Sequence, residues 1–132
     1  MRILTIAGCV VAAGTMLFAA DEAALHGAMK EIGPVCSGLG KKIKAKDATA
    51  SADAKTLVAS FGPVRKFFQE RKAEDGVAYS KTAAAEFKAI SKLTAKGKWD
   101  EADASFKKAT ATCGGCHKAH REKAADGSWK VK

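Results

Sequence analysis

Two cysteines and a histidine lie together near the C-terminus, in the run Cys113-Gly114-Gly115-Cys116-His117. This C-x-x-C-H spacing is the attachment signature of a c-type haem. Two thiols separated by two residues on a helical turn can form thioethers with both vinyl groups of one porphyrin, and the adjacent imidazole can bind the iron from the proximal side. The motif therefore predicts one covalent haem c, attached through Cys113 and Cys116, with His117 as the iron ligand.

The same pair of cysteines has two other interpretations. A thioredoxin-like redox site would need a βαβ context, and the sequence shows no strand pattern. A zinc site would need two further ligands at suitable spacing, and the body of the chain offers only Cys36, His26 and His120. Haem attachment is the interpretation that also agrees with the N-terminal segment, because c-type haem is attached outside the cytoplasm.

The first 20 residues have the features of a secretory signal peptide. Arg2 supplies a short positive region, an uncharged apolar stretch follows, and Ala19 and Ala20 precede the acidic pair Asp21-Glu22. We expect cleavage near Ala19 or Ala20 and export to the periplasm. Two alternatives stay open, namely a lipoprotein-type cleavage before Cys9 and an uncleaved N-terminal anchor.

Residues 21–132 then form the mature chain, which is long enough for one haem-binding domain. Loss of Arg2 with the signal lowers the net charge from +9 to +8, and the lysines are dispersed along the chain. The sequence has one tyrosine and no basic stripe rich in aromatic residues, so nucleic-acid binding has no support. We also expect no membrane span after signal cleavage.

Four segments of the mature chain show helical periodicity, with apolar residues recurring every three or four positions. They are expected at about residues 22–44, 51–72, 77–95 and 100–120. A seam of this kind is what a bundle helix presents to its neighbours. The expected fold is therefore all-α, an antiparallel four-helix bundle with a covalently attached haem.

Four local features refine this expectation. Gly62-Pro63 should kink or break the second helix, because proline removes a backbone donor and clashes with the preceding turn. Glu74-Asp75-Gly76 is assigned to the turn between the second and third helices. Asp100 is expected to be the N-cap of the fourth helix. Residues 126–132 are expected to be a short, polar, frayed tail.

The haem motif belongs to the apolar side of the last helix, and a methionine occupies the corresponding side of the first. Met29 lies on a seam with Leu25, Ile32 and Cys36, so its thioether is expected to point into the bundle. A methionine there can be an iron ligand or flexible core filler. Cys36 is expected to be a buried, unreactive thiol without a disulfide partner.

These residues resemble the class II c-type cytochromes, the family of cytochrome c-prime and its low-spin, methionine-ligated relatives. That family carries C-x-x-C-H-x-x-aromatic-Arg close to the C-terminus of a four-helix bundle, and here His120 replaces the aromatic residue while Arg121 matches. The run Met29-Lys30-Glu31-Ile32-Gly33 is similar to the M-K-x-x-G segment of the low-spin branch. The resemblance covers the mature chain in layout and is specific at these two motifs. Relatives often have an arginine where this chain has Leu25.

The resemblance implies that Met29 is the distal iron ligand, which makes the iron six-coordinate and low-spin. It also places Arg121 near the proximal side or a haem propionate, although a solvated cation favoured by the helix dipole is the simpler alternative. His26 is the rival distal ligand, and His120 is expected to pack beside the haem because it shares a helix with His117. Cofactor-binding residues are thus Cys113, Cys116, His117, Met29 and Arg121.

The expected function is that of a periplasmic electron carrier, not an enzyme, with other redox proteins as partners. The alternative is a five-coordinate cytochrome c-prime that binds NO or CO. A peroxidase would need polar groups beside the iron, where the seam offers Leu25, Ile32 and Cys36 instead. The sequence leaves open whether two bundles pair as a homodimer, as many relatives do.

Overall fold

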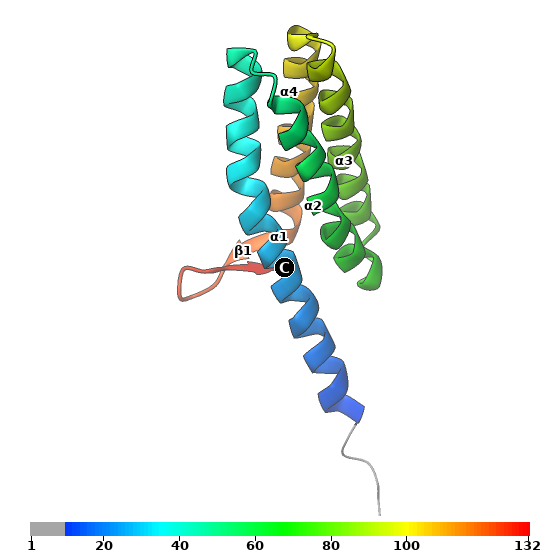
Figure 1. The fold of residues 1–132 in the computed structure, drawn as a ribbon. Helices are drawn as coiled ribbons and strands as arrows, with labels where there is room; N and C mark the ends of the chain where they lie inside the picture. Colours follow the sequence, from blue (N-terminus) through cyan, green and yellow to red (C-terminus); the bar gives the residue numbers. More distant parts are fainter. Residues whose placement is uncertain (1–9) are drawn as a thin grey trace, which may run out of the picture.

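Four helices make up most of the computed structural model, which describes the backbone of residues 10–132 and the side chains from Glu22 onward (Figure 1). Their bounds are α1 Val10–Ala45, α2 Ala50–Glu70, α3 Glu74–Ala95 and α4 Trp99–His120. The helices run alternately up and down, and α1 packs on α2, α2 on α3, and α4 on both α3 and α1. The mainly helical, antiparallel arrangement expected from the sequence is confirmed.

The helix α1 begins earlier than expected. Its first residue is Val10, so it includes the second half of the expected signal peptide, while residues 1–9 lie outside the described part of the chain. Figure 1 shows this N-terminal part of α1 extending beyond the other three helices. None of the helices in the described range has the length and apolar character needed to cross a membrane.

Two of the expected helix boundaries are wrong. Glu74-Asp75-Gly76 is the first turn of α3, where the two carboxylates complement the positive end of the helix dipole. Asp100 is not the N-cap of α4, because that helix already begins at Trp99 and its cap residue, Lys98, makes no side-chain cap hydrogen bond. The acidic residues Asp100 and Glu101 instead lie in the first turn.

The expected break at Gly62-Pro63 is absent from α2. The helix is continuous from Ala50 to Glu70 with Pro63 inside it. The flanking side chains of Phe61 and Val64 are both buried in the core. Their burial stabilises the helix on both sides of Pro63, which offsets the hydrogen bond that proline cannot donate.

The C-terminal tail is not frayed but forms a small hairpin. Strands β1 (Arg121–Lys123) and β2 (Trp129–Val131) pair antiparallel, with Arg121 opposite Val131 and Lys123 opposite Trp129. The turn between them uses Gly127 in the left-handed region, at φ 82°, a conformation that glycine adopts without steric cost. The backbone N–H of Ser128 also donates to a carboxylate oxygen of Asp126 over 2.9 Å.

Backbone bonds fasten this hairpin to the end of the bundle. The N–H of Lys132 donates to the carbonyl oxygen of His120 over 2.9 Å, and the N–H of Val131 donates to the Glu22 carboxylate on α1 over 3.4 Å. Val131 packs partly buried against the core. The hairpin is therefore attached to α1 and α4 on the side where the C-x-x-C-H motif lies.

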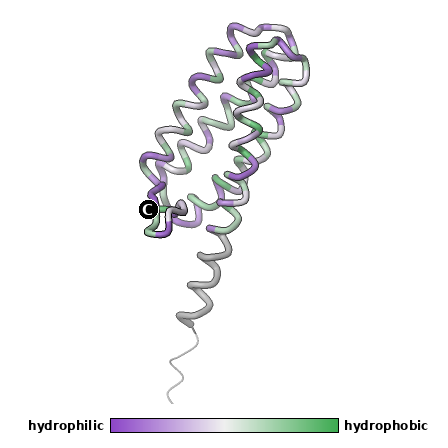
Figure 2. The backbone as a smooth tube through the Cα atoms, turned by 90° about the vertical axis from the view of Figure 1, so that its left-hand side faces the viewer, coloured by the Kyte–Doolittle hydropathy of each residue, from purple (hydrophilic) through white to green (hydrophobic). Residues whose placement is uncertain are grey.

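The core runs along the bundle between the inner faces of the helices. Figure 2 shows polar and apolar positions alternating along each helix, as expected for helices buried on one side. The largest fully buried side chains are Phe87, Leu39, Leu57, Ile90, Val64 and Ser80. Buried hydroxyl groups bond to the preceding helical turn, as Ser80 does to the carbonyl of Gly76 over 2.8 Å, so they do not interrupt the core.

Gly76 is required where α3 begins, because a Cβ atom at this position would overlap the ring of Phe68. Substitution of Gly76 by alanine should displace that buried ring and lower the free energy of unfolding by about 1–3 kcal/mol. Gly27 on α1 is the matched control, since a Cβ there meets nothing within 4 Å and alanine should raise stability by about 0.5–1 kcal/mol. Urea unfolding of the two variants measures both effects, and equal stability of Gly76→Ala and wild type would contradict the packing.

Candidate functional site

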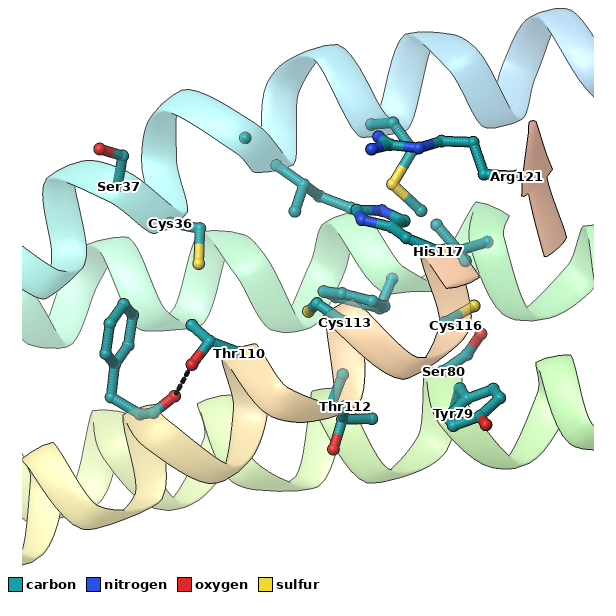
Figure 3. A pocket seen from close by; sticks show the side chains of 17 residues that line it. Cys36, Ser37, Tyr79, Ser80, Thr110, Thr112, Cys113, Cys116, His117 and Arg121 are labelled. Atoms are coloured by element: carbon teal, nitrogen blue, oxygen red, sulfur yellow. Dashed lines mark hydrogen bonds between the residues drawn. The ribbon is translucent and has the colours of Figure 1, made fainter. Parts of the chain in front are cut away.

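A cavity of about 350 Å³ lies inside the bundle beside the C-terminal turns of α4 (Figure 3). All four helices and the first residue of β1 contribute to its walls, and most of the side chains are apolar. They are Met29, Ile32, Gly33, Cys36, Ser37, Phe61, Val64, Tyr79, Ser80, Ala83, Phe106, Thr110, Thr112, Cys113, Cys116, His117 and Arg121. The cavity thus brings together the C-x-x-C-H motif and the methionine that the sequence placed on the opposite seam.

The helix α4 presents the three motif side chains to this cavity. Cys116 is buried, and Cys113 and His117 are partly buried. Their spacing of three and four residues puts them on one side of α4, as Figure 3 shows. Gly115 lets α3 approach the motif closely, because a Cβ atom at this position would lie 3.2 Å from the ring of Tyr79.

The ionisable groups of the motif are neutral at pH 7. Burial raises the pKa of Cys113 to about 11, with smaller contributions from Cys36 and Cys116. Burial also raises the pKa of Cys116 to about 11, and the Asp75 carboxylate adds to the shift. Burial lowers the pKa of His117, and the positive charge of Arg121 lowers it further.

These shifts separate the interpretations of the cysteine pair. A thioredoxin-like site needs a thiol whose pKa is lowered so that the thiolate is available, and both thiols here are shifted in the opposite direction. A neutral imidazole, by contrast, has a lone pair free to bind a metal ion. The raised pKa values therefore disfavour a thioredoxin-like site, and His117 is in the form that can bind a metal ion.

Met29 lies on the inner side of α1, as its spacing predicted. It is partly buried, packs against the core and lines the same cavity as His117. Leu25 and Ile32, one turn away on either side, are buried. The thioether of Met29 and the imidazole of His117 therefore border one space from two different helices.

His26, the rival to Met29, lies at the edge of the site. Its side chain is 42% exposed and its Nε2 atom lies 3.9 Å from the Glu22 carboxylate. It lines a neighbouring cavity of about 50 Å³, which also borders Met29 and His117, but it is not part of the wall of the larger cavity. The larger cavity thus offers Met29, not His26, as the donor on α1.

His120 also borders the smaller cavity and has partners of its own. Its Nε2 atom lies 2.8 Å from an oxygen of the Asp75 carboxylate, and its ring packs 4.8 Å from the ring of Phe68. Burial raises the pKa of Asp75, but hydrogen bonds from the Gly76 N–H and from His120 outweigh this effect and lower it. This contact ties the end of α4 to the start of α3.

Cys36 lies partly buried on α1 and is one of the thiols that border the cavity. Figure 3 shows its sulfur pointing from α1 toward the side of the cavity formed by α4. Burial raises its pKa, so the thiol is protonated at neutral pH. Cys36 is a free thiol, as the sequence predicted, but it belongs to the wall of the site and not only to the core.

Comparison of the chain with protein-family models, curated proteins and solved structures gives no match. The function therefore has to be argued from the cavity itself.

A haem fits the donors and walls of this cavity. Within the described range, no group of three or more His, Cys, Asp or Glu side chains is placed to hold a bare metal ion, which is what a zinc site would require. A porphyrin supplies four nitrogen ligands itself and needs only one or two from the protein. Two thiols, one imidazole, one thioether and a wall that is mostly apolar satisfy that need.

Sequence reasoning missed two residues near the site. The sequence predicts a turn at Asp75, which instead lies in the first turn of α3. It predicts a frayed tail at Trp129, whose ring centroid instead lies 3.8 Å from the guanidinium carbon of Arg121. A signal for the hairpin was present, because Asp126-Gly127-Ser128 has typical turn chemistry between two short segments. Its few apolar residues made that signal weak.

Proposed function

We propose that this protein is an exported mono-haem c-type cytochrome that carries electrons, with haem attached through Cys113 and Cys116. The observation that carries the proposal is the shared cavity. Both thiols, the His117 imidazole and the Met29 thioether border one apolar space inside a helical bundle. When bound there, haem supplies one-electron redox chemistry, which no amino-acid side chain of the cavity offers.

The motif side chains, Met29 and the apolar walls of the cavity would have different parts in this function. Cys113 and Cys116 would hold the cofactor on α4, and His117 would supply a nitrogen ligand. Met29 would supply a second iron ligand from α1, and a His/Met pair of ligands raises the reduction potential. The largely apolar walls, which include Phe61, Val64 and Ala83, would limit the contact of the redox centre with water.

The surroundings of Met29 favour electron transfer over catalysis. Its neighbours on α1 are Leu25 and Ile32, both buried and apolar, and the cavity wall includes no carboxylate. Cleavage of an O–O bond would need polar or acid–base groups at this place. The partner is then a second redox protein, and the net positive charge of the chain would make their association sensitive to salt.

Intact-mass measurement of the purified, denatured protein tests attachment and export together. We expect one species with the mass of residues 21–132 plus one haem, and a haem spectrum that stays with the polypeptide after extraction in acidified organic solvent. Haem that is extracted, or no haem at all, would refute the proposed attachment. A mass that includes residues 1–20 would show that the chain keeps its N-terminal segment.

A further inference from the structure

The C-terminal hairpin places one aromatic ring against one cation beside the site. The guanidinium carbon of Arg121 lies 3.8 Å from the ring centroid of Trp129, within the range of a strong cation–π contact. Trp129 is 45% exposed and is the one exposed large hydrophobic side chain in the described part of the chain. Burial in a core therefore does not explain why this position carries a tryptophan.

Arg121 connects this ring to the cavity. It is the first residue of β1, four positions after His117, and it lines both the larger and the smaller cavity. Figure 3 shows its side chain running back from β1 so that the guanidinium lies next to the His117 ring. An exposed arginine would otherwise sample many rotamers, so a fixed position requires a partner that holds it.

The hairpin gives the ring a fixed place. In the hairpin, Lys123 lies opposite Trp129 and Arg121 lies opposite Val131. The side chains of Arg121, Lys123 and Trp129 therefore lie on one face of the two strands. The bond from Val131 to Glu22 anchors that face to α1, and the bond from Lys132 to His120 anchors it to α4. The hairpin that carries the ring is therefore attached to both α1 and α4, the two helices with the proposed iron ligands.

We infer that Trp129 is a positioning residue that holds the Arg121 guanidinium beside His117 and thereby fixes a positive charge at the redox centre. This inference rests on the proposed function. Ferric haem carries one more positive charge than ferrous haem, so a fixed cation nearby disfavours the oxidised state. The stack of Trp129 on Arg121 should thus raise the reduction potential without changing the axial ligands.

Redox titration of the holoprotein tests this inference. Arg121→Gln should lower the ferrous-to-ferric ratio at a fixed ambient potential about tenfold, which corresponds to about 59 mV for one electron. Trp129→Ala should lower the ratio about threefold, or about 28 mV, because the charge remains but is no longer held in place. Trp129→Phe keeps a ring for the cation and should restore most of the difference.

Lys123→Gln is the matched control. Its Nζ atom lies 5.1 Å from the same ring, but Lys123 is part of neither cavity wall, so its loss should change the ratio less than twofold. The double variant Arg121→Gln with Trp129→Ala should have the potential of Arg121→Gln alone, because the ring acts only through that cation. The low-spin spectrum should be unchanged in all of these variants.

Three other results of the titration would refute the positioning role of Trp129. A wild-type potential in Trp129→Ala, or effects of the two substitutions that simply add, would refute the positioning role of the ring. An equal shift in Lys123→Gln would show that only the total charge of the hairpin matters, and would also refute it. Absence of covalent haem is detected before the titration and would overturn the proposed function instead.

Discussion

Replacement of Met29 by alanine is expected to convert the holoprotein from low-spin to high-spin and to open it to CO. Met29 lines the cavity from α1, and its neighbours Leu25 and Ile32 are buried side chains without a donor atom that could take its place. Loss of the thioether therefore leaves the distal side of the iron without a protein ligand. Visible spectra of the ferric and ferrous forms, with and without CO, measure the change. The ferrous variant should bind one CO per haem, whereas the wild-type protein should not respond.

Two matched variants make this experiment decisive. Cys36→Ala removes another sulfur from the same cavity wall and should leave the low-spin spectrum unchanged. His26→Ala should also leave it unchanged, because His26 borders only the neighbouring cavity. A wild-type spectrum in Met29→Ala would show that Met29 is core filler, and a high-spin spectrum in His26→Ala would make His26 the ligand. Ready CO binding by the untouched protein would favour the gas-binding alternative over the electron carrier.

Removal of both attachment thiols, Cys113→Ser with Cys116→Ser, should cost the protein much of its helical structure. Without haem the cavity of about 350 Å³ stays open in the middle of the bundle. The apolar contacts that a cofactor would make with these walls are then lost, and the whole stability of a small domain is only about 5–15 kcal/mol.

Far-UV circular dichroism and urea unfolding of the exported double variant measure this effect. We expect a reduced helical signal and a broad, weakly cooperative transition, because most of the stability of a helix in a protein comes from the packing of its apolar face, which the variant loses. The single variant Cys113→Ser keeps one attachment thiol and His117, and serves as the control that separates loss of haem from loss of a buried sulfur. Wild-type helicity with cooperative unfolding in the double variant would contradict the link between cofactor and fold.

The inner faces of the helices could be predicted because each helix buries one side. Leu39 in α1, Leu57 in α2, and Phe87 and Ile90 in α3 each belong to the apolar pattern of their own helix. All four side chains are fully buried. The location of Cys113, Cys116 and His117 on one side of a helix could also be predicted, because their spacing lies within one helical turn. Met29 was placed on the inner seam by the same argument from the first helix. What a periodic pattern can show is which side of an element faces inward.

Boundaries and long-range contacts could not be predicted in this way. The run Glu74-Asp75-Gly76 has the composition of a turn, but Gly76 lies in a helix because the ring of Phe68 fills the space next to it. The attachment of the hairpin to α1 depends on a bond between Val131 and Glu22, which are 109 residues apart. No local window of sequence contains both partners, so the position of the tail on the bundle could not be predicted.

The bond between the N–H of Lys132 and the carbonyl of His120 has a practical consequence for anyone who produces this protein. An affinity tag or fusion partner added after Lys132 would begin next to the strand that carries Trp129, three residues away from the ring. The turn at Gly97, between α3 and α4, lies at the opposite end of the bundle in Figure 1. A tag inserted at that turn would leave Lys132 and its bond to His120 undisturbed.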